Sequence, residues 1–281
     1  MAADGTYPQR MSEKREQPDK PDKGGRVHRL LVAELQAGET EIRGPEAHHL
    51  ANVLRVKPGA VVEAFDGAGS VASGTVVRVD RQSVAVSLEE PTPALTEAPL
   101  RVTVAVALLK SDKLSDVVRQ CTELGAAGFE LLVTRQADAT TISPARLLRL
   151  RRVAEEAARQ SGRATVPFVN EPVQLGALTW QGAALVAHPE SDVSLESVWL
   201  PRQPEHVPGV SSDVRGEGLK DETSTPTQVT LITGPEGGFG DEEVAELLQR
   251  GAVGVSFGPR ILRAETAPVA LTAALLLPGG R

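Results

Sequence analysis

Arg263 and Glu265 stand two residues apart in segment 258–266, which reads GPRILRAET. A guanidinium group can stabilise negative charge that develops on a substrate oxygen, and a carboxylate can accept a proton or orient that guanidinium. An ordinary ion pair beside the start of the last helix accounts for the two residues equally well. The segment therefore holds a candidate catalytic pair, with a structural alternative that the sequence leaves open.

A glycine-rich loop precedes this pair: residues 233–240 read TGPEGGFG and contain four glycines. Apolar runs at 229–232 and 253–257 lead into this loop and into segment 258–266, and a helical pattern follows each. In open α/β sheets ligands bind outside the carboxyl ends of the strands. Both loops are therefore expected to line one crevice.

The residues after the glycine-rich loop restrict its ligand. Asp241, Glu242 and Glu243 follow where a phosphate-binding loop would have Lys and Ser or Thr, and these carboxylates would repel a pyrophosphate. A neutral or cationic ligand is predicted instead, and S-adenosylmethionine fits because its sulfonium is positive. The alternative is that the glycines turn the chain and cap a helix.

Composition limits the function classes. The chain has 281 residues, 41% of them hydrophobic, which is enough for two domains. It contains no apolar run of about 18 residues, so no membrane span is expected. The one cysteine, Cys121, excludes an internal disulfide and fits a reducing cytoplasm. The net charge of −7 argues mildly against a nucleic-acid partner, so the distribution of charge matters more than its sum.

Two segments are rich in charged residues, proline and glycine and poor in large apolar residues. Residues 1–26 are predicted to be a disordered extension, because they bury too little apolar surface to offset the entropy of ordering. Residues 202–227 have the same composition and are predicted to be a flexible insertion.

Residues 27–93 show short alternating runs with turns, which predict a small β-rich module of barrel type. Asp66-Gly67 is a hairpin turn signal, and one helix is expected at Pro45–Leu54. His48 and His49 lack a spaced third ligand, so no metal site is predicted. Arg55, just after the helix, is a candidate phosphate contact.

Residues 100–281 alternate strand and helix patterns, which predicts an α/β domain with a mostly parallel sheet. A helix that begins with Ser143 as its cap and Pro144 as its first residue is unusually basic. Its arginines are most simply a solvated face, but in an acidic protein they are also the leading RNA-binding candidates. The candidates are Arg146, Arg149, Arg152, Arg159 and Arg163.

Six motifs in order resemble the ribosomal RNA small subunit methyltransferase E family. GPEGG at 234–238 and GPRILRAET at 258–266 are its most specific part, preceded by HHLANVLRVKPGAVVEAFDGAG, LLKSDKLSDVVRQCTELGA, AARQSGRATVP and VAHP. The likeness covers most of the chain from Val27 to Leu277 and passes over the two low-complexity segments. Gln120 departs from a usual lysine, and Ala264 and Ala267 from usual threonines, so those family roles are in doubt here.

The resemblance implies a trefoil-knotted methyltransferase domain of the SPOUT class and a PUA-like barrel associated with RNA binding. It implies S-adenosylmethionine as methyl donor, no metal, and methylation of N3 of uridine 1498 in 16S ribosomal RNA within the small subunit. It also implies a homodimer formed through the knotted domain. The donor-binding residues that it indicates are Ala187, His188, Thr233, Gly234, Glu236, Gly237, Gly238, Gly258, Ile261 and Leu262.

Two other functions stay open at this point. The first is a non-catalytic RNA-binding or ribosome-assembly factor that uses the barrel and the basic helix. The second is a knotted methyltransferase that acts on a ribose 2′-hydroxyl or on transfer RNA. Binding of S-adenosylmethionine separates an enzyme from a binding protein, and mapping of the modified nucleoside separates the two enzymes.

Overall fold

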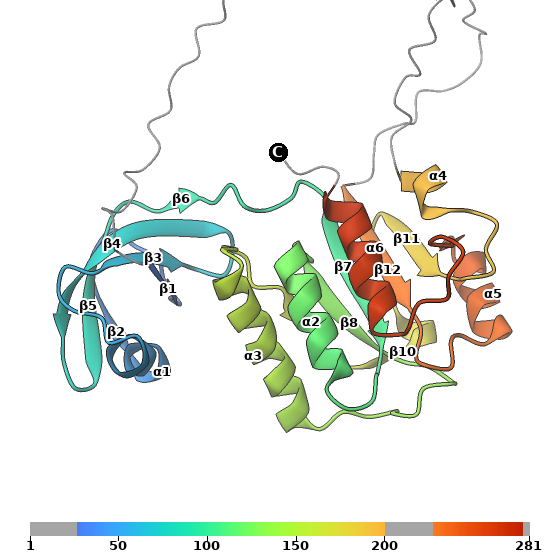
Figure 1. The fold of residues 1–281 in the computed structure, drawn as a ribbon, viewed down its shortest axis with the longest axis horizontal. Helices are drawn as coiled ribbons and strands as arrows, with labels where there is room; N and C mark the ends of the chain where they lie inside the picture. Colours follow the sequence, from blue (N-terminus) through green and yellow to red (C-terminus); the bar gives the residue numbers. More distant parts are fainter. Residues whose placement is uncertain (1–26, 200–226, 278–281) are drawn as a thin grey trace, which may run out of the picture.

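The computed structural model describes residues 27–199 and 227–277, which form two sheets, each with its own core (Figure 1). The extension predicted at 1–26 lies outside the described residues, as does nearly all of the insertion predicted at 202–227. The first sheet occupies the left of Figure 1 and the second the right.

The first sheet has six strands and curls around one apolar cluster that includes Leu30, Leu50 and Val86. Its strands pair in the order β1-β3-β4-β5-β2, with β6 on β4, and every pairing except β1 with β3 is antiparallel. The strands are β1 His28–Leu31, β2 Gly38–Arg43, β3 Val61–Phe65, β4 Ser70–Val79, β5 Ser83–Leu88 and β6 Thr92–Pro93. We call this unit the barrel.

The turn between β3 and β4 follows the prediction. The Oδ1 atom of Asp66 accepts hydrogen bonds from the backbone N–H groups of Ala68, Gly69 and Ser70 at 2.7, 2.9 and 3.0 Å. Gly67 takes a φ of +74°, a conformation that glycine adopts at little cost. The Asp-Gly pair is therefore the local cause of the hairpin.

The one predicted helix of the barrel is present as two joined pieces. α1, Gly44–His48, continues without a break into the π-helical η1, His49–Val53. The helix ends at Arg55, which has a φ of +52° and is exposed, while the N–H of Val56 returns to the carbonyl of Leu50 at 3.0 Å. A position that usually takes glycine thus carries an arginine in the left-handed region.

The second sheet has seven strands, and all of its pairings are parallel, as the near-continuous apolar runs predict. The order is β10-β8-β7-β12-β11-β13, with β9 on β8. The strands are β7 Arg101–Ala107, β8 Gly128–Val133, β9 Phe168–Val169, β10 Val173–Gln174, β11 Ala183–Ala187, β12 Gln228–Thr233 and β13 Val253–Val255.

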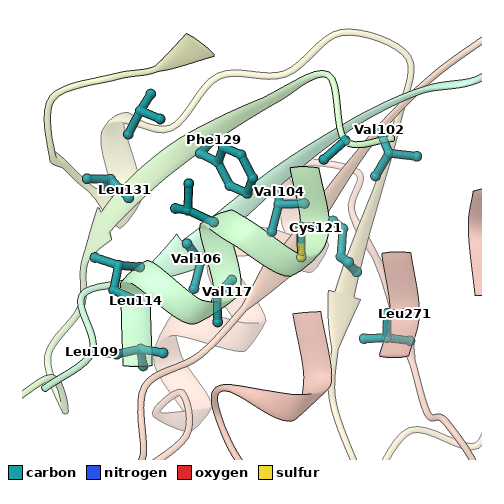
Figure 2. Packing of buried hydrophobic residues seen from close by; sticks show 14 of the residues in the cluster. Val102, Val104, Val106, Leu109, Leu114, Val117, Cys121, Phe129, Leu131 and Leu271 are labelled. Carbon is teal, nitrogen blue, oxygen red and sulfur yellow. The ribbon is translucent and has the colours of Figure 1, made fainter. Parts of the chain in front are cut away.

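Helices cover both faces of this sheet. One face packs against three helices, α2 Lys113–Leu124, α3 Pro144–Gln160 and α6 Thr266–Leu276, and Figure 2 shows Val104, Leu114 and Leu271 in that core. The other face packs against α5, Asp241–Gln249, and the 3₁₀ turn η2, Leu175–Ala177. A short helix α4, Leu195–Trp199, ends the first described range.

Local signals fix the helix ends. The hydroxyl oxygen of Ser143 accepts a hydrogen bond from the backbone N–H of Arg146 at 3.2 Å, so Ser143 caps α3 as predicted. Gly125, with a φ of +108°, ends α2. Cys121 on α2 is buried in the core, and this burial raises the pKa of its thiol to about 12.

Candidate active site

A cavity of about 660 Å³ lies at the carboxyl ends of β11, β12 and β13. Three loops line it: residues 187–190 after β11, 233–239 after β12, and 257–265 after β13. The crevice predicted from the strand–loop–helix pattern is therefore present, and we call it the donor pocket. All the residues indicated as donor-binding line it, namely Ala187, His188, Thr233, Gly234, Glu236, Gly237, Gly238, Gly258, Ile261 and Leu262.

In the glycine-rich loops, backbone atoms rather than side chains form part of the pocket wall. Gly238 and Gly258 take φ values of +77° and +69°, which side-chain-bearing residues rarely adopt. A Cβ on Gly234 would lie 3.3 Å from the backbone of Gly238, so this turn closes tightly. The hydroxyl of Thr233 is buried, lines the pocket, and has no hydrogen-bond partner among the described residues. A buried polar atom without a partner at a pocket wall is suited to a bound molecule.

Lys113 links two of the pocket loops and was not predicted as a site residue. Its Nζ lies 3.2 Å from Glu236 Oε1 and 3.3 Å from Glu265 Oε2, and it enters the pocket from the first turn of α2. The hydrogen bond to Glu236 and the ion pair with Glu265 raise the pKa of Lys113. The sequence holds a weak signal for it, because Lys113 follows the apolar run 102–109 in the segment KSDK.

Arg263 and Glu265 both line the pocket, but their mutual pairing is loose. Arg263 Nη1 is 4.0 Å from Glu265 Oε1, and the arginine side chain is 84% exposed. The backbone N–H of Glu265 lowers the pKa of its own carboxyl, and Lys113 lowers it further. Glu265 is therefore held as a carboxylate by Lys113, and Arg263 is free to reach a second molecule.

The arginines predicted to bind RNA divide into two groups. Arg55, Arg149 and Arg152 are exposed, although Arg149 also pairs with Asp112 at 3.0 Å. Arg146 is half-buried, and its Nη2 donates to the carbonyls of Leu109 and Ser111. It therefore ties α3 to the loop that precedes Lys113.

Arg159 and Arg163 correct the prediction. Their side chains are 9% and 5% exposed, and their guanidinium groups pair with Glu46 and Glu97 at 3.1 and 2.7 Å. An exposed RNA surface on α3 does not include them, because both guanidinium groups are buried: Arg159 pairs with carboxylates, and Arg163 binds Glu97 and two backbone carbonyls.

The described residues also bear on two other possibilities, a metal site and a membrane-spanning helix. Over residues 27–199 and 227–277, no group of three His, Cys, Asp or Glu side chains is arranged to hold a metal ion. None of the helices in these same ranges is long and apolar enough to cross a membrane.

Comparison with known proteins agrees with this geometry. A family model described as RNA methyltransferase domain matches residues 96–276, and one described as RNA methyltransferase PUA domain matches residues 42–89. The ribosomal RNA small subunit methyltransferase E of Synechocystis sp. is 36% identical over 246 residues, which cover 86% of this chain and 75% of that protein. The protein of the same name from Bacillus subtilis is 31% identical over 241 residues, or 83% and 88% of the two chains.

The chain belongs to the ribosomal RNA small subunit methyltransferase E family. A methyltransferase from Legionella pneumophila, solved with bound S-adenosylmethionine, matches this family member with a TM-score of 0.74 at 26% identity, covering 91% of this chain and 99% of that one. The predicted fold class, a SPOUT-type knotted domain with a PUA-like barrel, is confirmed.

Proposed function

We propose that this protein transfers the methyl group of S-adenosylmethionine to N3 of uridine 1498 in 16S ribosomal RNA. The observation that carries the proposal is the donor pocket: three loops that are far apart in sequence meet at the strand ends of a chain from this family. The Legionella structure with S-adenosylmethionine supports the choice of donor, and the names of the curated relatives support the choice of RNA.

The pocket residues fit S-adenosylmethionine. The charged residues that line the pocket are slightly acidic in sum, which suits a ligand with a positive group better than a phosphate: Glu190, Glu236, Asp241 and Glu265 against Lys113, Arg260 and Arg263. Ile261 and Leu262 offer apolar contact for an adenine ring, and the glycine loops and Thr233 offer polar groups for the rest of the molecule. When bound, S-adenosylmethionine supplies a methyl carbon attached to a positively charged sulfur.

Two side chains at the pocket are assigned roles in methyl transfer. The N3 proton of uracil would pass to solvent water, N3 would then form its bond to the methyl carbon, and the carbon–sulfur bond would break with its electrons staying on sulfur. Arg263, exposed at the rim, can stabilise negative charge on a uracil carbonyl oxygen. Glu265 has a lowered pKa, which makes it a weak proton acceptor, so we assign it the orientation of Lys113 and Arg263.

The RNA surface that we propose joins the barrel to the pocket rim. Arg55 lies at the end of a π-helical turn in a left-handed conformation, and strained residues of this kind cluster at functional sites. Arg149 and Arg152 add positive charge on the exposed side of α3. Ribosomal RNA as substrate places the reaction in the cytoplasm.

A second copy of the chain is the protein partner that we propose. α6 buries Leu271, Leu275 and Leu276 against the core, yet Ala270 and Ala273 are half-buried, and Ile261 beside the pocket is 85% exposed. A twofold axis near this surface would cover these apolar groups through a self-complementary patch. Light scattering should report a dimer, and Ala273→Glu should convert it to a monomer. The neighbouring Ala274 is not a suitable site for this change, because it packs against the core of its own chain.

The deciding experiment maps the modified nucleoside. Purified protein, labelled S-adenosylmethionine and small ribosomal subunits lacking the modification are incubated, and the RNA is digested and analysed by mass spectrometry. We expect 3-methyluridine at a single position, and Arg263→Ala should abolish it while the protein stays folded. A ribose-methylated product or a labelled transfer RNA would favour the alternative enzyme, and RNA binding without transfer would favour the assembly factor.

A further inference from the structure

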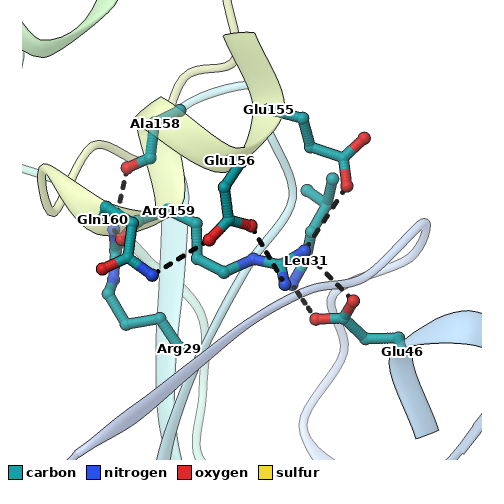
Figure 3. A network of polar contacts seen from close by, with 8 residues as sticks. All are labelled: Arg29, Leu31, Glu46, Glu155, Glu156, Ala158, Arg159 and Gln160. Atoms are coloured by element: carbon teal, nitrogen blue, oxygen red, sulfur yellow. Dashed lines mark hydrogen bonds and ion pairs between the residues drawn. The ribbon is translucent and has the colours of Figure 1, made fainter. Parts of the chain in front are cut away.

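Charged side chains are concentrated where the barrel meets the end of α3 (Figure 3). Arg29, Glu46 and Glu63 come from the barrel, and Arg159 and Arg163 come from α3 and the segment after it. We call this group of five residues the seam. Backbone hydrogen bonds reinforce it, since Gly69 N–H donates to Ala164 O and Val166 N–H to Gly67 O, at 3.2 and 2.9 Å.

Arg29 caps α3 from the other domain. Its Nη1 lies 3.3, 3.2 and 3.0 Å from the carbonyl oxygens of Ala158, Arg159 and Arg163. These carbonyls lie at and just beyond the helix end, where backbone acceptors lack partners within the helix. The same guanidinium pairs with Glu63 at 2.7 Å and lies over the ring of Phe65 at 4.7 Å. Arg29 can make all these contacts in one orientation of the barrel.

Arg159 makes the reciprocal contact. Its Nη2 lies 3.1 Å from Glu46 Oε2, and the other oxygen of Glu46 accepts the backbone N–H of Leu31 at 3.3 Å. Arg163 extends the contact to α2, because it donates to the carbonyls of Thr122 and Ala126 at 2.9 and 2.8 Å. The barrel therefore contacts the end of α3 directly and reaches α2 only through Arg163, whose carbonyl accepts from Arg29.

The opposite end of α3 reaches the pocket rim. Arg146 binds the carbonyls of Leu109 and Ser111 at 2.9 and 2.7 Å, and Arg149 pairs with Asp112 at 3.0 Å. The next residue is Lys113, which lines the pocket. A helix of 17 residues is about 25 Å long and resists bending. α3 thus connects the barrel to the pocket as one rigid element.

Buried ion pairs seldom stabilise a fold more than apolar side chains of the same size would. Here Nη2 of Arg29 and Nε of Arg159 have no hydrogen-bond partner among the described residues, so the seam is costly as a stabilising device. Directional contacts of this kind fix orientation instead. We propose that Arg29 and Arg159 are positioning residues for RNA methylation: they set the barrel on α3, and α3 carries that orientation to the donor pocket.

This inference rests on the proposed function, and its test separates the two. Arg29→Met keeps an unbranched, largely apolar side chain, shorter than arginine, and removes every polar contact; Glu46→Gln is the milder change at the same place. Each variant is assayed for affinity for S-adenosylmethionine by calorimetry, and for kcat and KM on small ribosomal subunits. Arg119→Met, which removes an exposed arginine of α2 that pairs with Asp116 and Glu123, is the matched control. If the unaltered protein fails to methylate these subunits, it is the proposed function that is wrong.

We expect Arg29→Met to lower kcat/KM for RNA by on the order of tenfold or more, because small misplacements of a reacting group are costly. Donor affinity should stay within about twofold, since the pocket loops are untouched. Glu46→Gln should show the same pattern with a smaller loss, and it decides the matter if Arg29→Met does not fold.

A covalent lock distinguishes positioning from direct contact with RNA. Ala68 and Thr165 face each other as an antiparallel bridge across the domain boundary, so Ala68→Cys with Thr165→Cys is placed to form a disulfide. In the Arg29→Met background, oxidation of this pair should restore most of the lost kcat/KM, and reduction should remove it again. An unchanged kcat/KM in the folded variants, or a loss that the disulfide does not restore, would overturn the proposal.

Discussion

Charged side chains gather at the seam and at the donor pocket, but the two regions differ in exposure. Arg159 and Arg163 at the seam are 9% and 5% exposed, whereas Lys113 and Arg263 at the pocket are 36% and 84% exposed. A buried charge is held by its desolvation cost, because separation from its partner leaves it unpaired. A half-exposed charge exchanges partners with water at little cost. The seam is therefore suited to a fixed geometry, and the pocket to rearrangement around a ligand.

The largest difference is expected in stability. Arg163→Met should lower the free energy of unfolding by about 3 kcal/mol or more, because Glu97 and two backbone carbonyls lose a buried cation. Arg152→Met, which removes the same side chain from an exposed position, should change it by no more than about 0.5 kcal/mol. Urea denaturation gives both values, and equal losses would remove the distinction between the two regions.

At the pocket, Lys113→Met should impair catalysis more than folding. Without Lys113, the carboxylate of Glu265 loses a cation, so its pKa should rise from its lowered value. If the carboxylate is the active form, the acid limb of the pH–rate profile moves to higher pH, and kcat falls by about tenfold. Lys110→Met, which removes an exposed pair with Asp138, is the control and should leave the profile in place.

Two glycines with positive φ, one at the pocket and one in the barrel, allow a matched test of backbone strain. Gly238→Ala places a side chain at a φ of +77° with open space around it, which costs about 1 kcal/mol of stability and shifts the loop. Donor affinity measured by calorimetry should fall several-fold. Gly59→Ala creates the same strain in the barrel at a φ of +86°, so it should cost similar stability and leave donor affinity unchanged.

The smallest effects are expected on the exposed arginines. Arg149→Gln and Arg152→Gln should each reduce the slope of log affinity for RNA against log salt by about 1, with little change in stability. Filter binding over a series of salt concentrations measures this slope. Unchanged slopes in both variants would show that the RNA does not pass over this part of α3.

Local signals made much of the fold predictable. Ser143 and Pro144 start α3, Gly125 ends α2, and Asp66-Gly67 makes the hairpin, because each acts through its own backbone and nearest neighbours. The pocket was predictable for a related reason: each of its loops follows an apolar strand, and parallel strands bring their carboxyl ends together. The agreement of the predicted donor residues with the pocket lining follows from that rule and from the family resemblance.

The features that could not be predicted from the sequence depend on contacts between segments that are distant along the chain. Arg152 and Arg159 look alike in the sequence, and only the presence of Glu46 from the barrel makes the second of them a buried residue. Lys113 was missed for the same reason, since Glu236 stands 123 residues further along the chain. The spacing of residues along a helix shows which side chains share a face. It does not show which other segment packs against that face, because the tertiary fold decides this.

Cys121 has a practical consequence for measuring this arrangement. Its thiol is buried, and this burial raises its pKa to about 12, so alkylating reagents should not modify the folded protein. Cysteines introduced at exposed Val53 in the barrel and Leu248 on α5 would then be the sites that accept spectroscopic labels. The width of the distance distribution between those labels would report directly how many orientations the barrel visits.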